Sequence, residues 1–373
     1  MSLKNIVFIL LMGKNNKYAG LPMVSICTPT FNRRPFIASM IKCFEHQTYP
    51  KNRMEWIIID DGTDKIEELV SHVPQVKYFK YDTKMTLGVK RNLLNEKATG
   101  AIIVYMDDDD YYPPERVRHA VDSLQRNPKA LCAGSSTLFC YFKHVNKMIQ
   151  FGPYGPNHST AATFAFKREL LKITRFDENS SVAEEKKFLK DYTIPFVQLD
   201  PKKSILVVSH EQNSFDKKEL LLQGPNPAMK ESNLVPADFI KEPDLLSFFM
   251  TDINNLSAYE AGKPENKPDV IKQIAELKKV REAMRIDHIK KQTAQAEAMN
   301  QIQTTSLPPE VQFKLNEVNN INQRLTIENK QLIDKVKYLE DKMKQLISER
   351  VQEKMRERNI KLSQDGPTVH LST

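Results

Sequence analysis

The sequence predicts an α/β fold, with a mostly parallel sheet in the first half of the chain and a helical C-terminal region that contains a coiled coil. Four short β-rich segments alternate with segments of helical periodicity between residues 24 and 125, which predicts the sheet. A heptad repeat from Leu315 onward predicts the coil. A chain of 373 residues is long enough for two domains, or for one α/β domain with an appendage.

The expected elements of the first half follow one another at short spacing. They are a strand at 24–28, a helix at 35–47, a strand at 54–59, a helix at 66–73, a strand at 76–80, a helix at 87–98, a strand at 101–105 and a helix at 114–125. Beyond Pro128 we expect a hairpin from 131–143 and 145–151, a strand at 161–166 leading into a helix at 167–172, and a last strand at 205–208. Such alternation favours right-handed crossovers between parallel strands.

The composition is that of a globular protein, with 40% hydrophobic and 27% charged residues and a formal net charge of +8. Residues 266–373 hold 20 Lys or Arg against 15 Asp or Glu, so +5 of this charge lies in the last part of the chain. The basic character is therefore mainly a property of the tail, and we expect no nucleic-acid partner.

The cysteine usage suits a reducing compartment, because the four cysteines form no CxxC pair and no zinc-spaced cluster with histidine. The apolar run 6–12 is short for a signal peptide and lacks a small-residue cleavage site, so an extra strand or a disordered start are the alternatives to a secretory signal. No stretch approaches transmembrane length. We therefore predict a cytoplasmic protein with no transmembrane segment.

Consecutive acids, Asp107 to Asp110, directly follow the apolar segment 101–105. Charged carboxylates cannot share the burial of a strand, so they must emerge into a cleft or bind a cation. Ligands collect at the carboxyl ends of strands in open α/β sheets, and these acids are well placed to hold a divalent metal and a phosphate. A solvated acidic turn before Pro113 and Pro114 is the alternative.

Six segments between residues 23 and 214, a little over half of the chain, resemble in order the motifs of the family 2 glycosyltransferases, whose fold is GT-A. The segments are Pro29-Thr30-Phe31-Asn32-Arg33, Ile59-Asp60-Asp61-Gly62-Thr63-Asp64, Gly88-Val89-Lys90-Arg91-Asn92, Met106-Asp107-Asp108-Asp109-Asp110, Phe176-Asp177-Glu178 with Ala183-Glu184-Glu185, and His210 with Asn213. Each motif alone is weakly specific, whereas their order and spacing together are specific.

The resemblance implies a metal-dependent, inverting hexosyltransferase that moves a sugar from a nucleoside-diphosphate sugar, a UDP-sugar first of all, to an acceptor hydroxyl, with Mn²⁺ or Mg²⁺ as cofactor. It implies nucleotide binding by Pro29, Thr30, Asn32, Arg33, Asp60, Asp61, Lys90, Arg91, Asp107 and Asp108. It assigns the metal to Asp109 and Asp107, with His210 close to the metal or the diphosphate. Glu185 matches the general base, but the chain has Glu-Glu where the family usually has Glu-Asp, so Glu184 is the alternative.

Several of these residues also have a purely structural interpretation. Asp60 and Asp61 could cap the helix that follows them, and glutamates at a helix start favour the helix dipole. Lys90 and Arg91 are cations near a helix start, where the helix dipole disfavours positive charge. A nearby anion would explain their presence there. Alternatively, Arg91 could be a plain surface cation. His210 could be a packed histidine.

The tail predicts self-association. One seam position of the heptad holds Leu315, Asn322, Asn329, Val336 and Met343, and the other holds Val318, Leu325, Leu332, Leu339 and Leu346. Asparagine at the first position with leucine at the second favours a parallel homodimer, whereas Ile333 and Ile347 beside the seam leave a higher oligomer open. A helix folded back onto the globular domain is the alternative.

The predicted organisation is an extension at 1–21, a GT-A domain at 22–222, a proline-rich linker at 223–268 with one short apolar helix near 245–249, a helix at 269–303, a coiled coil at 310–358 and a tail at 359–373. The predicted partners are a nucleotide-sugar donor, an acceptor that is a glycan, a protein or a lipid, and further copies of the chain. Two rival functions stay open: a degenerate transferase that works as a scaffold through its coil, and a nucleotidyltransferase, for which no glycine-rich triphosphate loop is present.

Overall fold

The computed structural model describes residues 20–364, apart from 183, 214–216, 223–225, 227 and 305–307. The segment 6–12, for which a strand or a signal was considered, lies outside the described residues, as do residues 365–373. The chain divides into two compact units, Met1–Arg281 and Glu282–Thr373.

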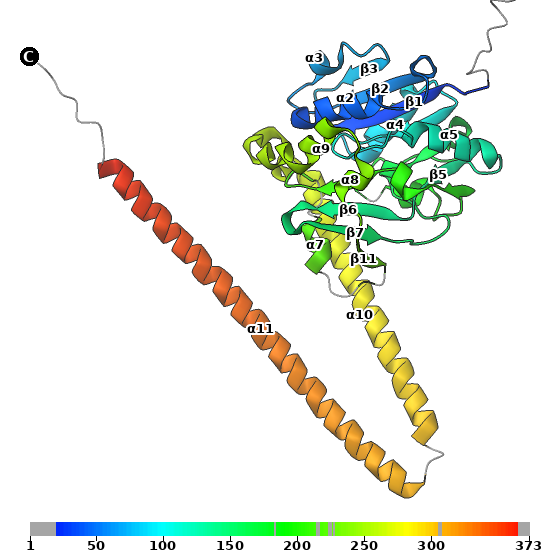
Figure 1. The fold of residues 1–373 in the computed structure, drawn as a ribbon. Coiled ribbons are helices and arrows are strands. Elements are labelled where there is room, and N and C mark those ends of the chain that lie inside the picture. Colours follow the sequence, from blue (N-terminus) through cyan, green and yellow to red (C-terminus); the bar gives the residue numbers. More distant parts are fainter. Residues whose placement is uncertain are drawn as a thin grey trace, which may run out of the picture. The chain divides into compact units, whose positions relative to one another are not determined.

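The first unit contains a seven-stranded sheet with the order β3-β2-β1-β4-β8-β5-β9 (Figure 1). Its strands are β1 (Val24–Thr30), β2 (Met54–Asp60), β3 (Val76–Lys80), β4 (Ile102–Tyr105), β5 (Cys132–Gly134), β8 (Ala165–Lys167) and β9 (Phe196–Gln198). β3, β2, β1 and β4 pair in parallel, whereas β8 is antiparallel to both β4 and β5. The predicted parallel sheet is thus confirmed for the four strands that alternate with helices.

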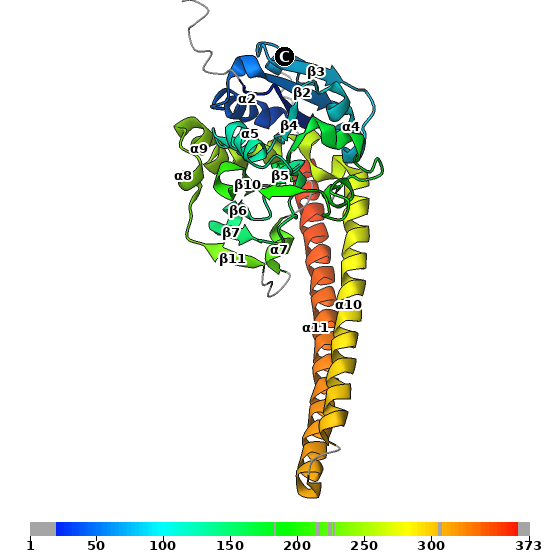
Figure 2. The same cartoon turned by 90° about the vertical axis from the view of Figure 1, so that its right-hand side faces the viewer.

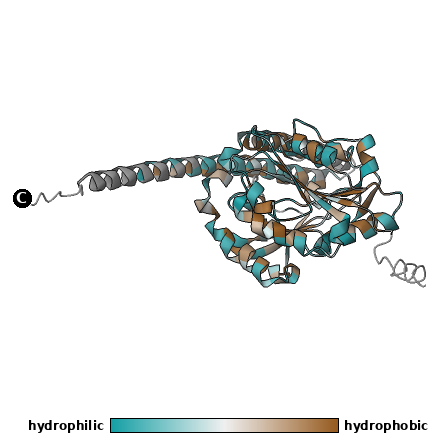
Figure 3. Cartoon of the chain, turned by 90° about the horizontal axis from the view of Figure 1, so that it is seen from above, coloured by the Kyte–Doolittle hydropathy of each residue, from teal (hydrophilic) through white to brown (hydrophobic). Residues whose placement is uncertain are grey.

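Helices cover both faces of this sheet, because successive strand residues point to opposite sides. α2 (Ile37–Glu45) and α5 (Arg116–Arg126) pack with Ile26 and Val104 in one core, and α4 (Leu87–Lys97) packs with Cys27 and Tyr105 in the other. Figure 2 shows α2 and α5 on one side of the strands and α4 on the other. In Figure 3 the hydrophobic residues concentrate on the strands between these helices. The shorter helices are α3 (Glu67–Val70), α6 (Glu185–Phe188), α7 (Lys218–Leu222), α8 (Pro236–Phe239) and α9 (Pro243–Met250).

A second, four-stranded sheet has the order β10-β6-β7-β11. The predicted hairpin is confirmed as β6 (Leu138–Phe142) and β7 (Lys147–Phe151), and the expected late strand is β10 (Leu206–Ser209). The segment expected as one strand at 131–143 is divided, since β5 belongs to the first sheet and β6 to the second. Between them the backbone N–H of Ser135 donates to Thr163 Oγ1 instead of a strand neighbour. This lets the chain pass from one sheet to the other.

The strand and helix expected at 161–172 are shorter than predicted. β8 pairs with β4 over Ala165–Lys167, between single 3₁₀ turns at Ala161–Thr163 and Arg168–Lys172. The carbonyls of Thr163 and Phe164 accept hydrogen bonds at 2.8 Å from the buried Arg116 guanidinium. The Phe164 carbonyl also accepts from Tyr105 N at 3.0 Å, so the Arg116 guanidinium joins the hydrogen bonding where the pairing with β4 ends.

The predicted linker at 223–268 is instead part of the first unit over its described residues. It contains β11 (Met229–Ser232), which pairs with β7, and the helices α8 and α9. Phe239, Leu245 and Phe249 of this segment are buried in the core. Pro236 and Pro243 stand at the starts of α8 and α9, where proline is tolerated, and burying each of the three apolar side chains stabilises by about 1.5–3 kcal/mol.

Two long helices follow: α10 (Pro268–Thr304), which begins in the first unit, and α11 (Pro309–Gln364). The predicted helix at 269–303 is confirmed, and the segment 310–358 is helical throughout. Pairing of that segment in a coiled coil stays a prediction. Within the described part of the chain, no helix has the length and apolar character needed to cross a membrane.

Phe188 of α6 is expected to be a main contributor to the stability of the first unit. Its ring stacks on Phe176 at a centroid distance of 4.1 Å and lies near Phe164 and Phe166, with none of the residue exposed. Replacing Phe188 by Ala should lower the free energy of unfolding by about 3–5 kcal/mol, as measured in urea. The control is Ile173→Ala, because Ile173 is 49% exposed. A loss no greater than that of the control would contradict this packing role.

Candidate active site

The carboxyl ends of β1, β2 and β4 meet at one edge of the sheet. Thr28 Oγ1 of β1 donates to Met106 O, just after β4, at 2.7 Å and accepts from Trp56 Nε1 of β2 at 2.9 Å. The register pairs Thr30 with Asp60, the last residues of β1 and β2. The acids that follow β4 therefore emerge next to the turn that follows β1.

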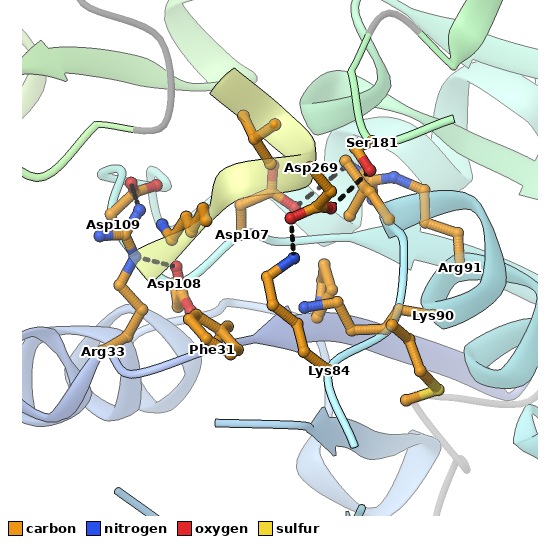
Figure 4. A pocket seen from close by; sticks show the side chains of 15 residues that line it. Phe31, Arg33, Lys84, Lys90, Arg91, Asp107, Asp108, Asp109, Ser181 and Asp269 are labelled. Carbon is orange, nitrogen blue, oxygen red and sulfur yellow. Dashed lines mark hydrogen bonds and ion pairs between the residues drawn. The ribbon is translucent and has the colours of Figure 1, made fainter. Parts of the chain in front are cut away.

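A cavity of about 150 Å³ opens at this edge (Figure 4). Of the predicted site residues it is lined by Pro29, Arg33, Lys90, Arg91, Asp107, Asp108 and Asp109. These side chains come from the turn after β1, from α4 and from the segment after β4. The structure thus brings together the first, third and fourth of the six motifs, and both charge signs face the same space.

Arg33 holds two of the aspartates. Its Nη2 lies 3.0 Å from Asp109 Oδ2 and its Nε lies 3.4 Å from Asp108 Oδ1, while Nη1 donates to Gln212 O. Burial raises the pKa of Asp108 to about 7, although Arg33 opposes the rise. Burial acts in the same direction on Asp109, but Arg33 and His210 outweigh it and hold the pKa of that carboxyl well below its usual range. Asp109 is therefore the firmly ionised acid of the pair.

Arg91 joins the acidic segment to the predicted base. Its Nε lies 2.6 Å from Glu184 Oε1, and its Nη2 lies 3.6 Å from Asp107 Oδ1. The guanidinium is stacked over the Tyr105 ring at 4.5 Å. Burial raises the pKa of Asp107, and Arg91 opposes that rise. The cation at the start of α4 is thus explained by two carboxylates, and the surface interpretation of Arg91 is wrong because the residue is buried.

The two candidate bases differ in their surroundings. Glu184 is 4% exposed and is bound by Arg91, so its carboxylate is already neutralised by a cation. Glu185 begins α6, and burial together with the Glu184 charge raises its pKa to about 7. A base works best when its pKa lies near the operating pH. The surroundings therefore favour Glu185 over Glu184 for this role.

α4 and the loop before α6 approach each other closely at Gly88. The Gly88 N–H donates to Ser180 O at 2.8 Å, and a Cβ at Gly88 would lie 1.9 Å from the backbone oxygen of Asp177. Only a residue without a side chain fits there. This contact places the 177–181 loop, and with it Ser181, at the rim of the cavity.

His210 lies beside the acids but is held by its neighbours. Its Nε2 lies 3.5 Å from Asp109 Oδ2 and 2.8 Å from Asn213 Nδ2, and its ring packs at 4.8 Å from the Phe36 ring. Burial lowers the pKa of His210 to about 4. His210 is therefore neutral at pH 7, and Asn213 fixes its orientation next to Asp109.

The acids after β2 point into the protein and do not line the cavity. Asp60 accepts from Gly62 N, Ile66 N and the Tyr78 hydroxyl, so it fixes the turn between β2 and α3. Asp61 accepts from Met85 N at 2.6 Å and pairs with Lys90 Nζ at 2.8 Å. Thr30 and Asn32 also lie outside the cavity lining, and both are buried. Asn32 links the turn after β1 to Asp64 N and to Ala261 O.

Several cavity residues were not predicted. Figure 4 shows Asp269 between Lys84 and Ser181, and the Asp269 carboxylate binds both side chains. Lys267, which is 5% exposed, lines the same cavity. Burial and the nearby Arg33 lower the pKa of Lys267 to about 7. No local motif marks these residues, because the segment around Lys267 and Asp269 reaches the site only through the tertiary fold.

The carboxylate side chains at this site suit a divalent cation that also binds a phosphate-bearing ligand. Asp107 Oδ1 is buried and makes no hydrogen bond among the described residues, and Arg91 Nη2 faces it at the longer distance of 3.6 Å. In the described part of the chain, no group of three or more His, Cys, Asp and Glu is arranged to hold a metal ion, so Asp107, Asp109 and His210 do not form such a group. Mg²⁺ in enzymes is commonly bound by one or two carboxylates plus substrate phosphates. Asp107 and Asp109 fit that mode.

The size of the cavity implies that binding moves some of its walls. Pockets that hold small molecules typically measure about 300–1,000 Å³, against about 150 Å³ here. Asp269 and Val270, at the start of α10, fill the side of the cavity near Lys84. A nucleotide-sized ligand would therefore require some of the lining side chains to move aside.

Comparison with known proteins finds a family match for part of the chain. The family model described as glycosyl transferase family 2 matches residues 25–180. An uncharacterized glycosyltransferase of Haemophilus influenzae is 26% identical over 208 residues, which are 52% of this chain and 79% of the relative. The poly(ribitol-phosphate) β-N-acetylglucosaminyltransferase TarS of Staphylococcus aureus is 27% identical over 109 residues, which are 26% of this chain and 18% of the relative.

Solved structures with a related arrangement include residues 1–349 of S. aureus TarS in complex with UDP-GlcNAc, with 19% identity and a TM-score of 0.42 over 67% of this chain and 78% of that one. The mannosyltransferase PcManGT of Pyrobaculum calidifontis, in complex with GDP-Man and Mn²⁺, has 16% identity and a TM-score of 0.42 over 65% of this chain and 74% of that one. The family match contains the motifs of the cavity, from the turn after β1 to the loop before α6. Residues 25–180 of the chain therefore match the model of glycosyl transferase family 2, and the curated relatives that the chain resembles are named glycosyltransferases.

Proposed function

We propose that the chain transfers a sugar from a nucleoside-diphosphate sugar, a UDP-sugar first of all, to an acceptor hydroxyl, with inversion at the anomeric carbon. The observation that carries this proposal is the cavity where Asp107, Asp108 and Asp109 lie beside Arg33 and Arg91. A diphosphate leaving group brings concentrated negative charge, and cations fixed in a partly buried site stabilise it strongly. The family match supports the sugar as the transferred group.

Different residues are proposed to bind the diphosphate and the metal ion and to position the nucleotide. Arg33 and Lys267 are proposed to contact the diphosphate, since both are buried and line the cavity. Asp109 and Asp107 are proposed to hold Mn²⁺ or Mg²⁺, which as a bound Lewis acid would neutralise charge that grows on the departing diphosphate. Asp61 and Lys90 form an ion pair inside the protein. They are proposed to affect nucleotide binding indirectly, because this pair fixes the position of α4.

Glu185 is proposed as the general base. It would remove the proton from the acceptor hydroxyl as that oxygen attacks the anomeric carbon from the face opposite the diphosphate. A single displacement of this kind inverts the anomeric configuration. Arg91 acts as a positioning residue, since it binds Glu184 and faces Asp107 and so fixes the base segment relative to the acids.

We also propose that α11 joins copies of the chain in a parallel coiled coil. The leucines of the second seam position are about half exposed or more in the single chain, from 49% for Leu325 to 59% for Leu332. An apolar stripe of this length is typically covered by another helix.

The donor proposal is tested by thermal shift with UDP-GlcNAc, GDP-Man and UDP-glucose, each with MnCl₂ or with EDTA. One donor at about 100 times its Kd should raise the Tm by several degrees, because that occupancy stabilises by about 2.7 kcal/mol. EDTA and Asp109→Ala should each remove most of the shift, whereas Asp122→Ala, which alters an exposed pair with Arg118 on α5, should retain it. No shift with any donor would favour the scaffold, and release of pyrophosphate from a nucleoside triphosphate would favour the nucleotidyltransferase.

The activity should rise with pH. The pKa of Glu185 is raised to about 7, so its carboxyl is protonated below pH 7 and becomes an effective base above it. We expect kcat/KM to increase through about pH 7 and Glu185→Gln to lose roughly 10²–10⁴-fold in rate. Glu169→Gln, at an exposed position, is the matched control. A profile without that rise, together with an active Glu185→Gln, would exclude Glu185 as the base.

Self-association is tested by light scattering. The intact chain should run as a dimer, and Leu332→Lys should make it monomeric because a buried seam excludes an unpaired charge. Ile327→Lys is a matched control, since Ile327 is also 59% exposed but lies at an outer heptad position. A monomeric wild-type chain, or equal effects of both substitutions, would contradict the proposal.

A further inference from the structure

A second cavity lies beside the candidate active site and is bordered by the loop 152–160. Its volume is about 440 Å³, and its lining includes Tyr154, His158, Thr160, Lys217 and Arg281. This volume falls within the roughly 300–1,000 Å³ of small-molecule sites. Unlike the first cavity, none of the described residues that line it is acidic.

The aromatic side chains of the loop form a row. The Tyr154 ring lies 4.9 Å from the His158 ring, which lies 5.0 Å from the Tyr192 ring. Asn157 fixes this arrangement by donating to Tyr192 O at 3.1 Å. Tyr154 is 49% exposed although its neighbours are packed, so its ring offers an apolar face at the cavity.

Two polar atoms in the cavity wall can form hydrogen bonds with a ligand. Thr160 Oγ1 and His158 Nδ1 are buried, and neither has a hydrogen-bond partner within the described residues. Leaving a buried polar group without a hydrogen-bond partner is energetically unfavourable. A ligand that carries hydroxyl groups would supply the missing partners.

The position of the cavity relates it to both ends of the proposed reaction. Val207 lines the cavity, and the backbone N–H of the next residue, Val208, donates to Asp110 Oδ1 at 3.4 Å. At the other end, the His158 ring lies 5.0 Å from the Tyr192 ring, and the N–H of the neighbouring Asp191 donates to the carbonyl of Lys186, which follows the proposed base. The cavity therefore borders both the acids after β4 and the segment of the proposed base.

We propose that this cavity is the acceptor site and that it takes a saccharide with a negatively charged group, such as a uronic acid or a sugar phosphate. The sugar ring packs on Tyr154, its hydroxyl groups bind Thr160 and His158, and its anionic group faces Lys217 and Arg281. This inference rests on the proposed function, because an acceptor site has meaning only if a sugar is transferred.

The test is saturation-transfer NMR on the full chain with methyl β-D-glucuronide and, as the neutral partner, methyl β-D-glucoside, each titrated through the millimolar range. The glucuronide should bind more tightly than the glucoside. Arg281→Gln should weaken glucuronide binding roughly tenfold and leave the glucoside unchanged, whereas Tyr154→Ala should weaken both. The matched controls are Arg285→Gln, at an exposed residue paired with Glu282, and Tyr338→Ala, at an exposed residue of α11.

Thr160→Val keeps the shape of the side chain and removes only its hydroxyl group, so it should weaken binding without a change in Tm. Equal binding by wild type, Tyr154→Ala and Arg281→Gln would overturn the proposal, as would glucoside binding as tight as that of the glucuronide, or no binding of either. Donor binding is measured on the same samples by thermal shift. A wild-type chain that binds a donor but neither saccharide refutes only the acceptor site, whereas one that binds no donor refutes the proposed function.

Discussion

The site depends on one constraint: cations must compensate the negative charge of the buried carboxylates that follow β4. Ionised carboxylates taken out of water cost several kcal/mol each unless cations and hydrogen bonds face them. Here the cations come from separate parts of the chain: Arg33 from the turn after β1, Arg91 from α4, and Lys267 from the segment before α10. The sheet edge, the helix and the C-terminal segment must therefore be in place together, and the cavity forms only when the whole first unit folds.

The fold was predictable where local periodicity and burial agree. Val24–Thr30 and Met54–Asp60 are buried at every residue, and the helices between the strands show one apolar face, so β1 to β4 were found. The segment 223–268 was not, because its prolines and short apolar runs are typical of a linker. The segment is buried because Phe239, Leu245 and Phe249 pack into a hydrophobic core that other elements also form. The hydrophobic periodicity of the segment does not predict this packing.

The site was predictable to the extent that it lies in strand ends. Acids after β4 and a cation after β1 are local patterns, and the structure brings them together. Asp60 and Asp61 have the same kind of local pattern, yet they face inward because Tyr78, Met85 and Lys90 satisfy them there. Lys84, Lys267 and Asp269 were missed, since their approach to the cavity is set by tertiary contacts alone.

One element, α10, contributes to both cavities: Asp269 and Val270 line the first and Arg281 lines the second. The family match ends at residue 180, whereas the walls of the two cavities extend to Arg281. A protein truncated where the family match ends would retain Asp107 to Asp109 but lose the proposed base Glu185 and the α10 wall of each cavity. An α-helix is also stiff over these three to four turns, so a displacement of α10 at Asp269 would be transmitted to Arg281 and would change the walls of both cavities together.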